Sequence, residues 1–383
     1  MELSIQQADL AFAAGRALGS VAVRNPLPLL SCVLVEAESG GVRVTGTDLD
    51  VTTSVFVPCQ VKTPGKAAVS ARHFNDVVRK LPKGELKLSI KSNQCEVAYG
   101  GGKGWSRFPT QPAGEFPRIP ERMAETRLQI EGDALSRLAG RTSYAASTED
   151  ARPQLNGVLI ESRKDQLALI ATDGHRLARA VRKGSFAALD DKGLIIPARA
   201  LSAVSRTAEE ATSAVEIEVA GGRNQAGFST RVGEYRVQIL TRLLEGDYPN
   251  YQQVVPKDNP KEMQAKRDDL IEAVDIVASH ADNVTRQVRF ALRRGRLGVS
   301  STTPELGAGE QQLDADYQGD DMEIGYNASY LLDILRSIPT ERVVFRLKTA
   351  LSAGLIEPVG AMPLAEESML CLIMPLRLPD AVG

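Results

Sequence analysis

The chain of 383 residues repeats one local pattern three times, at intervals of about 130 residues. The first copy spans residues 71–82 and the third spans residues 328–339, and in both the apolar residues recur at positions i, i+3, i+4 and i+7. This spacing predicts a short amphipathic helix, which Pro82 and Pro339 would end. The middle copy, residues 198–206, is the weakest. A threefold repeat predicts three similar domains instead of one large core.

A second helix is predicted to open each repeat, because apolar residues at helical spacing begin at Leu10, Leu135 and Leu270. Between the two helices of a repeat lie short apolar runs with the composition of β-strands. The clearest of these runs are residues 32–35, 42–44, 158–160, 167–170 and 288–291. Turns rich in Gly, Asp and Lys separate them, as in antiparallel meanders. Each repeat is therefore predicted to pack two helices on antiparallel sheets, an α+β architecture.

Two proline-rich connectors, residues 109–120 and 249–260, divide the repeats. We expect few contacts to cross between domains at such linkers. The predicted domains are an N-terminal domain of residues 1–124, a central domain of residues 125–253 and a C-terminal domain of residues 254–383.

The composition is that of a globular protein, since 43% hydrophobic and 25% charged residues give each repeat enough apolar side chains for a core. No stretch reaches the roughly 18 apolar residues of a membrane span, and the N-terminus lacks the apolar run of a signal peptide. The four cysteines lie far apart in the sequence, which disfavours both a zinc site and a disulfide framework. We therefore expect a cytoplasmic protein.

The net charge of −2 says little about where the charges lie. Basic residues dominate the segments 71–83 and 197–207, whereas the helix that opens the third repeat is acidic at Asp268, Asp269 and Glu272. Two interpretations stay open. The basic helices either form a surface that follows a phosphate backbone without reading bases, or they are the solvated faces of amphipathic helices.

Known catalytic and cofactor motifs are missing from the sequence. The glycine-rich segments 100–104 and 221–223 lack the spacing of a phosphate-binding loop or a dinucleotide fingerprint, and we predict that they are hairpin turns. There is no Gly-x-Ser-x-Gly motif and no His-Glu-x-x-His motif, and the chain has only three histidines. We expect no catalytic residue, no metal site and no cofactor.

One segment carries residues that the repeat does not explain. Residues 172–177 read Thr-Asp-Gly-His-Arg-Leu, whereas the first repeat has Thr-Asp-Leu-Asp at 47–50 and the third has Thr-Thr-Pro at 302–304. The shared threonine is predicted to belong to the fold, and the additional Gly-His-Arg-Leu is a candidate functional segment. Two alternatives stand beside that interpretation: a hydrolase in which Asp173 and His175 transfer protons, and a plain glycine turn with a packed histidine.

Several motifs together resemble the bacterial DNA polymerase III beta subunit family, the sliding clamps. They occur in the family's order across the whole chain, at residues 46–49, 155–157, 172–178, 246–251, 322–327 and 374–378. The resemblance implies a DNA-clamp fold of three similar domains and a head-to-tail homodimer closed into a ring, with helices lining the hole and sheets outside. It also implies a processivity factor without catalysis of its own.

The resemblance further implies the partners. These are double-stranded DNA bound without sequence preference, the alpha subunit of the replicative DNA polymerase, the clamp loader complex, and other polymerases and repair proteins that carry a clamp-binding peptide. That peptide, with a glutamine and apolar anchors, would bind between the second and third domains. A scaffold that binds peptides but never meets DNA remains the alternative to a clamp.

Carried over from the family residue by residue, the peptide would contact fifteen residues, which we call the predicted peptide site. They are Leu155, Thr172, Gly174, His175, Arg176, Leu177, Pro249, Val254, Leu351, Leu372, Met374, Pro375, Leu376, Arg377 and Leu378. For DNA contact the family implies Arg24 and Arg152, and the basic helices add Arg72, Arg79, Lys80 and Arg199.

Three features depart from the family pattern. Glu149 stands where some members have a glutamine that faces DNA, and its carboxylate would repel phosphate. Residues 379–383 extend past the usual ending. His280 and Ala281 occupy the place of an apolar pair that helps to seal the dimer in well-known members.

Overall fold

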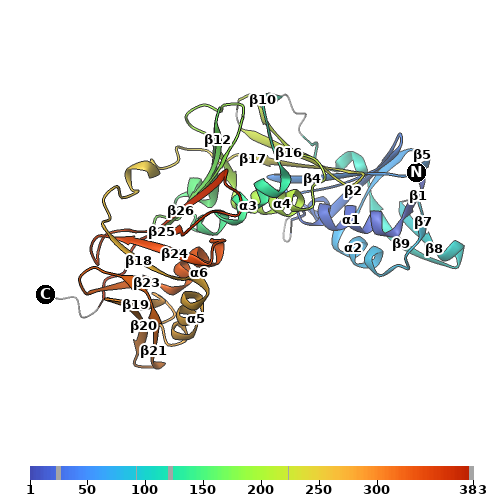
Figure 1. Cartoon of the computed structure of the whole chain (residues 1–383). Coiled ribbons are helices and arrows are strands. Elements are labelled where there is room, and N and C mark those ends of the chain that lie inside the picture. The colour runs from blue at the N-terminus through green and yellow to red at the C-terminus, as the bar shows by residue number, and fades with distance from the viewer. Residues whose placement is uncertain (23–26, 92, 120–123, 223, 379–383) are drawn as a thin grey trace. The chain divides into compact units, whose positions relative to one another are not determined.

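The computed structural model describes residues 1–22, 27–91, 93–119, 124–222 and 224–378 (Figure 1). The chain forms two compact units. Unit 1 combines Met1–Ser136 with Arg199–Leu243, and unit 2 combines Arg137–Ala198 with Leu244–Gly383. The central repeat therefore contributes its residues to both units.

Unit 1 contains one antiparallel sheet of thirteen described strands. In sheet order they are β10 (Ala124–Ile130), β15 (Val215–Ala220), β16 (Gln225–Val232), β17 (Tyr235–Arg242), β4 (Val51–Pro58), β3 (Gly41–Thr47), β2 (Cys32–Glu38), β6 (Gly65–Ser70), β9 (Gly104–Gln111), β8 (Gln94–Tyr99), β7 (Glu85–Lys91), β1 (Glu2–Gln6) and β5 (Gln60–Thr63).

Helices α1 (Gln7–Leu18) and α2 (Ala71–Lys80) lie side by side on one face of this sheet (Figure 1). The core beneath α1 joins its buried stripe to alternate valines of three strands: Leu10, Ala13, Ala14, Ala17, Val42, Val44, Val55, Val57 and Val237. Because successive side chains of a strand point to opposite faces, the residues between these valines lie on the face away from α1. Two further helices, α3 (Gly132–Gly140) and α4 (Ala198–Glu209), belong to the central repeat.

Unit 2 contains two antiparallel sheets and helices α5 (Arg267–Ala278) and α6 (Ala328–Ser337). The nine described strands of the larger sheet are β14 (Leu194–Pro197), β11 (Gly157–Arg163), β12 (Gln166–Thr172), β13 (Arg176–Lys183), β26 (Glu367–Ile373), β25 (Gly354–Pro358), β24 (Arg342–Leu347), β18 (Lys261–Lys266) and β22 (Asp316–Tyr317). The four of the smaller sheet are β21 (Gly307–Asp314), β20 (Arg296–Thr303), β19 (Gln287–Arg293) and β23 (Met322–Asn327).

Strand pairing joins neighbouring repeats directly. In unit 1, β4 of the first repeat pairs with β17 of the central repeat, from Arg236 opposite Phe56 to Thr241 opposite Val51. In unit 2, β13 of the central repeat pairs along its length with β26 of the third. The expectation that few contacts cross between repeats is therefore wrong, because the backbone groups at the edge of one repeat are satisfied by the next.

The predicted helices are confirmed in the described residues. Helices α2 and α6 cover the first and third copies of the repeated pattern, α4 covers the weak middle copy, and α1, α3 and α5 open the three repeats. The segment at Gly100–Gly102 is the predicted hairpin turn, because it connects the paired strands β8 and β9. No helix in the described ranges is long and apolar enough to cross a membrane.

Several strands have a backbone edge without a ladder partner among the described residues, and β21 and β9 are two of them. Strand β21 ends the smaller sheet of unit 2 and pairs only with β20. Strand β9 pairs along one side with β8, but β6 meets its other side only at Thr110 and Gln111. Unpaired edges of this kind are available to another chain.

Candidate partner site and nucleic-acid contacts

The Thr172–Asp173 pair builds a hydrogen-bonded turn between β12 and β13. The Thr172 hydroxyl donates to the carbonyl of Arg176 at 2.6 Å and accepts from the amide of Gly174 at 3.1 Å. The Asp173 Oδ1 accepts from the amides of His175 and Arg176, at 2.8 and 2.9 Å. Side chains that bond to nearby amides in this way stabilise a tight turn locally.

The first repeat uses the same turn. Thr47 Oγ1 accepts from the amide of Leu49 at 3.1 Å, and Asp48 Oδ1 accepts from the amides of Asp50 and Val51. The prediction that the shared threonine belongs to the fold is confirmed for the first and central repeats. What remains particular to the central repeat is the Gly-His-Arg-Leu sequence that completes its turn.

Gly174 has a φ of 93°, a backbone conformation that residues with a side chain rarely adopt. A Cβ at this position would lie 3.1 Å from Nη1 of Arg152, whose Nη2 donates to the carbonyl of Asp173 at 3.1 Å. The glycine therefore allows Arg152 to lie across the turn. His175, which follows, is exposed, so the alternative of a packed histidine is wrong.

Arg176 is buried beneath the turn, with 8% of its surface exposed. Its guanidinium pairs with Asp173 at 3.1 Å and with Asp333 at 2.6 Å, and it lies over the ring of Tyr330 with the guanidinium carbon 4.5 Å from the centroid. The imidazole of His175 stacks on the same tyrosine at a centroid distance of 6.3 Å. Burial raises the pKa of the Tyr330 hydroxyl, so this ring stays neutral.

These contacts leave no hydrogen bond between the Asp173 carboxylate and the His175 ring among the described residues. One carboxylate oxygen accepts the two amides of the turn, and the other meets the guanidinium of Arg176. Proton transfer between an acid and a base needs them within hydrogen-bond reach. The geometry therefore does not supply the Asp–His pair of the hydrolase alternative.

The apolar members of the predicted peptide site divide into buried and exposed residues. Leu177 of β13 lies opposite Leu372 of β26, and both join a core cluster with Tyr251. Leu155, Leu177 and Leu372 are at most 4% exposed. Met374, Leu351 and Val254 are 42%, 59% and 58% exposed, and Pro249 is exposed as well. The buried residues support the surface from below, and the exposed residues offer the most apolar area to a ligand.

Met374 is hydrogen-bonded to the Thr172–Asp173 turn, whereas the residues after it contact the smaller sheet of unit 2. The amide of Met374 donates to the carbonyl of His175 at 2.8 Å. Leu376 instead forms a bridge with Gly325 of β23, and Gln287 of β19 donates to the carbonyl of Arg377 at 2.8 Å. Leu376, Arg377 and Leu378 thus run along the smaller sheet of unit 2, and Pro375 is the half-buried residue between the two parts.

Near this site, a hollow of about 400 Å³ is lined by residues 246–252, which include Pro249. Within the same segment, the Tyr248 hydroxyl accepts from the amide of Thr172 at 3.1 Å. Sequence reasoning did not assign Tyr248, Tyr330 or Asp333 to the site. For Tyr248, the one sequence signal was the motif at residues 246–251, which contributed to the family resemblance.

The residues predicted to contact DNA differ in exposure and in whether a carboxylate already pairs with their charge. Arg72, Arg79 and Lys80 are exposed on α2. Arg199 is 60% exposed, but its guanidinium pairs with Asp48 at 2.5 Å, which commits part of its charge. In unit 2, Arg152 lies 4.0 Å from the carboxylate of Glu149. Arg24 lies outside the described residues.

Comparisons with known proteins agree across the whole chain. Three family models match in sequence order: the N-terminal domain of the DNA polymerase III beta subunit at residues 1–120, its central domain at residues 129–250 and its C-terminal domain at residues 252–377. The beta sliding clamp of Caulobacter vibrioides is 30% identical over 384 residues, covering 99% of this chain and 100% of the relative. That of Escherichia coli K12 is 29% identical over 382 residues, with the same coverage.

Solved structures agree in fold. The sliding clamp of Pseudomonas aeruginosa bound to griselimycin has a TM-score of 0.88 at 30% identity, covering 99% of this chain and 100% of that one. The polymerase sliding clamp of Caulobacter crescentus has a TM-score of 0.87 at 30% identity, with the same coverage. The chain therefore belongs to the DNA polymerase III beta subunit family, the sliding clamps.

Proposed function

We propose that this sliding clamp encircles duplex DNA as a head-to-tail homodimer and tethers the replicative polymerase through the predicted peptide site. The observation that carries the proposal is the match of all three beta-subunit models, in order, along one chain. The three domains proposed for the clamp are residues 1–124, 125–253 and 254–383. We further propose that the protein works in the cytoplasm and performs no catalysis, and that an ATP-driven clamp loader opens it.

DNA is held by enclosure in this proposal, so individual contacts to it can be weak. Exposed cations such as Arg72, Arg79 and Lys80 of α2 attract phosphates without reading bases. Such contacts exchange readily with salt ions, which lets a ring slide. The modest net charge of −2 is compatible with this role, because only the surface that faces DNA needs to be basic.

The peptide side of the proposal rests on the residues around the Thr172–Asp173 turn. Exposed Met374 and Leu351 offer apolar area for side-chain anchors. The exposed His175 ring, held by Tyr330, offers a polar group for the glutamine of the peptide. Arg176 is almost fully enclosed by its own partners, so its role is to position the turn.

Retention on DNA of different topology tests the enclosure. The clamp is loaded onto a nicked circular plasmid and then separated from free protein by gel filtration. We expect it to stay with the circle and to be lost once a restriction enzyme linearises the plasmid, because a ring slides off free ends. Equal retention on both forms would indicate conventional binding to a site and would reject the enclosure.

Substitution of exposed apolar residues tests the predicted peptide site separately. Met374→Ala combined with Leu351→Ala removes apolar area without opening the core, so we expect the fold to be kept. Binding of a labelled peptide from the polymerase alpha subunit should weaken at least about tenfold in calorimetry. Val284→Ala is the control, because Val284 is 90% exposed in the same unit but outside the site. Unchanged affinity of the double variant would reject the assignment.

A further inference from the structure

A row of charged side chains crosses the sheet of unit 1 on the face away from α1. Arg231 of β16 lies opposite Arg236 of β17, Arg236 lies opposite Phe56 of β4, and Phe56 lies opposite Arg43 of β3. Residues directly opposite one another share a face of the sheet. The adjacent valines of β3, β4 and β17 belong to the core under α1, which places the row on the opposite surface. We call Arg43, Arg231 and Arg236 the basic row.

Phe56 fixes two members of the basic row. Its ring is only 6% exposed although it lies on the face away from the helices. The guanidinium carbon of Arg236 lies 4.1 Å from the ring centroid, and that of Arg43 lies 5.6 Å from it. Gly41 leaves room for the ring, since a Cβ there would lie 2.6 Å from Phe56 Cζ. The two cations are therefore preorganised by stacking, which lowers the entropy cost of binding an anion.

Two of the three charges lack a counter-charge. Arg43 pairs with Glu38 at 2.6 Å, but neither Arg231 nor Arg236 forms an ion pair within the described ranges of the chain. Like charges directly opposite each other on neighbouring strands destabilise a sheet. Arg231 and Arg236 occupy directly opposite positions of neighbouring strands without an ion-pair partner in the described part of the chain, and a bound anion would reduce the repulsion between them.

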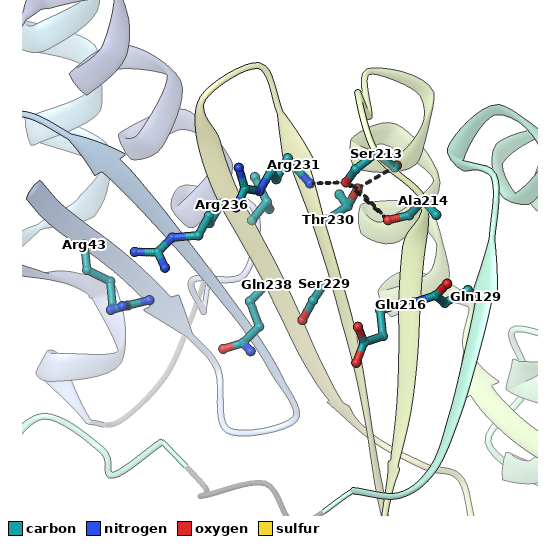
Figure 2. Close-up of a pocket in the computed structure, with 11 residues that line it drawn as sticks. Arg43, Gln129, Ser213, Ala214, Glu216, Ser229, Thr230, Arg231, Arg236 and Gln238 are labelled. Carbon is teal, nitrogen blue, oxygen red and sulfur yellow. Dashed lines mark hydrogen bonds between the residues drawn. The ribbon is translucent and has the colours of Figure 1, made fainter.

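Beside the basic row lies a hollow of about 360 Å³ with a polar lining (Figure 2). Gln238 and Ser229 line it next to the arginines, and Figure 2 shows them on the same strands, β17 and β16, as Arg236 and Arg231. The hydroxyl of Ser213 accepts from the amide of Arg231 at 3.1 Å and so fixes the backbone of that arginine. Arginines that border such a hollow can hold a carboxylate through paired, charge-assisted hydrogen bonds.

We propose that the basic row and this hollow form a second docking surface of the clamp, which binds an acidic peptide segment of a partner protein. A glutamate or aspartate of the segment enters the hollow and takes paired hydrogen bonds from Arg231 and Arg236. The surface is separate from the predicted peptide site, which lies in unit 2 and is predicted to bind apolar anchors. A partner that uses both surfaces gains from the linkage of two weak contacts.

The surroundings favour a peptide over a single-stranded nucleic acid. Bases need an exposed aromatic face for stacking, whereas Phe56 is covered by the guanidinium groups. Carboxylates also border the surface, with Glu38 beside Arg43 and Glu216 in the lining of the hollow. Glu216 lies 3.6 Å from Arg127, which also lies 3.4 Å from Glu218, so the charge of Glu216 is partly offset within the protein. A continuous chain of phosphates would run past both carboxylates, whereas a single acidic side chain in the hollow would meet only Glu216.

Fluorescence anisotropy with the full-length clamp tests the proposal. The probes are a rhodamine-labelled peptide of alternating glutamate and serine, the same peptide with glutamine in place of glutamate, and an oligothymidylate of equal length. We expect the glutamate peptide to bind and the glutamine peptide not to bind. Arg231→Gln with Arg236→Gln should weaken binding of the glutamate peptide about tenfold.

Arg242→Gln is the matched control, because Arg242 is exposed on β17 but does not line the hollow. The affinity of this variant for the glutamate peptide should equal that of the wild type. Circular dichroism and binding of the polymerase peptide should be unchanged in the double variant. A loss of glutamate-peptide affinity below about threefold would overturn the proposal. Tighter binding of oligothymidylate that depends on the same two arginines would also overturn it and would assign the surface to nucleic acid.

Discussion

The two Thr–Asp turns differ at the position where the backbone is most constrained. The central repeat has Gly174 there, with a φ of 93°, and the first repeat has Leu49 with a φ of 83°. In this backbone conformation a leucine is destabilised by about 1–2 kcal/mol relative to a glycine, because its Cβ crowds the backbone. Because Leu49 is 47% exposed, its side chain recovers little of that cost by burial.

Leu49→Gly should therefore raise the free energy of unfolding, by about 0.5–1 kcal/mol after the greater chain entropy of glycine is subtracted. The urea midpoint of the full chain measures the effect. The reciprocal change, Gly174→Ala, should destabilise, since its Cβ would crowd Arg152 and the φ is unfavourable. A lower midpoint for Leu49→Gly would show that the leucine is held by contacts that outweigh the strain.

At the scale of elements, a buried ion pair attaches α3 to the first residue of β26. The Glu367 side chain is fully buried and accepts from Arg137 of α3 at 2.8 Å and from Arg141 at 2.5 Å. Burial raises the pKa of Glu367, but the hydrogen bonds from Arg137 and Arg141 and their charges outweigh it and hold the pKa below its ordinary value. Strand β26 leads directly to Met374, so the pair helps to position the predicted peptide site.

Glu367→Gln leaves two arginines without their counter-charge and should cost about 3–5 kcal/mol of unfolding free energy at neutral pH. Because the folded pKa is lowered, the stabilisation is present above the ordinary glutamate pKa of about 4.3 and is lost as the pH falls through the folded value. Urea unfolding measures the difference in unfolding free energy between the variant and the wild type. This difference should be smaller below pH 4 than at pH 7. Glu366→Gln is the control, since Glu366 is 56% exposed and should cost less than about 1 kcal/mol.

The helices and the repeat were predictable from sequence because they depend on local spacing, as Phe74 and Val78 of α2 illustrate. The strand ladders between repeats were not, since β4 and β17 lie far apart in the sequence and no local pattern reports their pairing. For the same reason, the sequence does not reveal which residues contact Arg176. Asp333 and Tyr330 lie on α6, more than a hundred residues away, and their spacing there serves an ordinary amphipathic helix.

At the scale of the whole molecule, the unpaired edges of β9 and β21 predict association between copies of the chain. Trp105 of β9 is 56% exposed and is stacked by Arg107, with the guanidinium carbon 4.1 Å from the ring centroid. Exposed aromatic residues on an open strand edge are typical of an interface.

Light scattering should give twice the chain mass of 41.3 kDa across a dilution series. Trp105→Ala should raise the dissociation constant of the dimer at least about tenfold if the β9 edge forms the interface. Leu27→Ala, which removes another exposed apolar residue of unit 1, should leave it unchanged. A monomer at every concentration would contradict the ring. An unchanged dissociation constant for Trp105→Ala would show that the interface does not involve the β9 edge.

The ladder between β4 and β17 also decides what happens when the covalent chain is severed between them. A protease that cleaves after the exposed Arg118 cuts the backbone between β9 and β10, yet β4 on one fragment still pairs with β17 on the other. The hydrogen bonds of that ladder and the core beneath α1, to which Val237 of β17 contributes, do not depend on the cut peptide bond. Nicked protein therefore stays one particle under native conditions and separates into two pieces only on a denaturing gel.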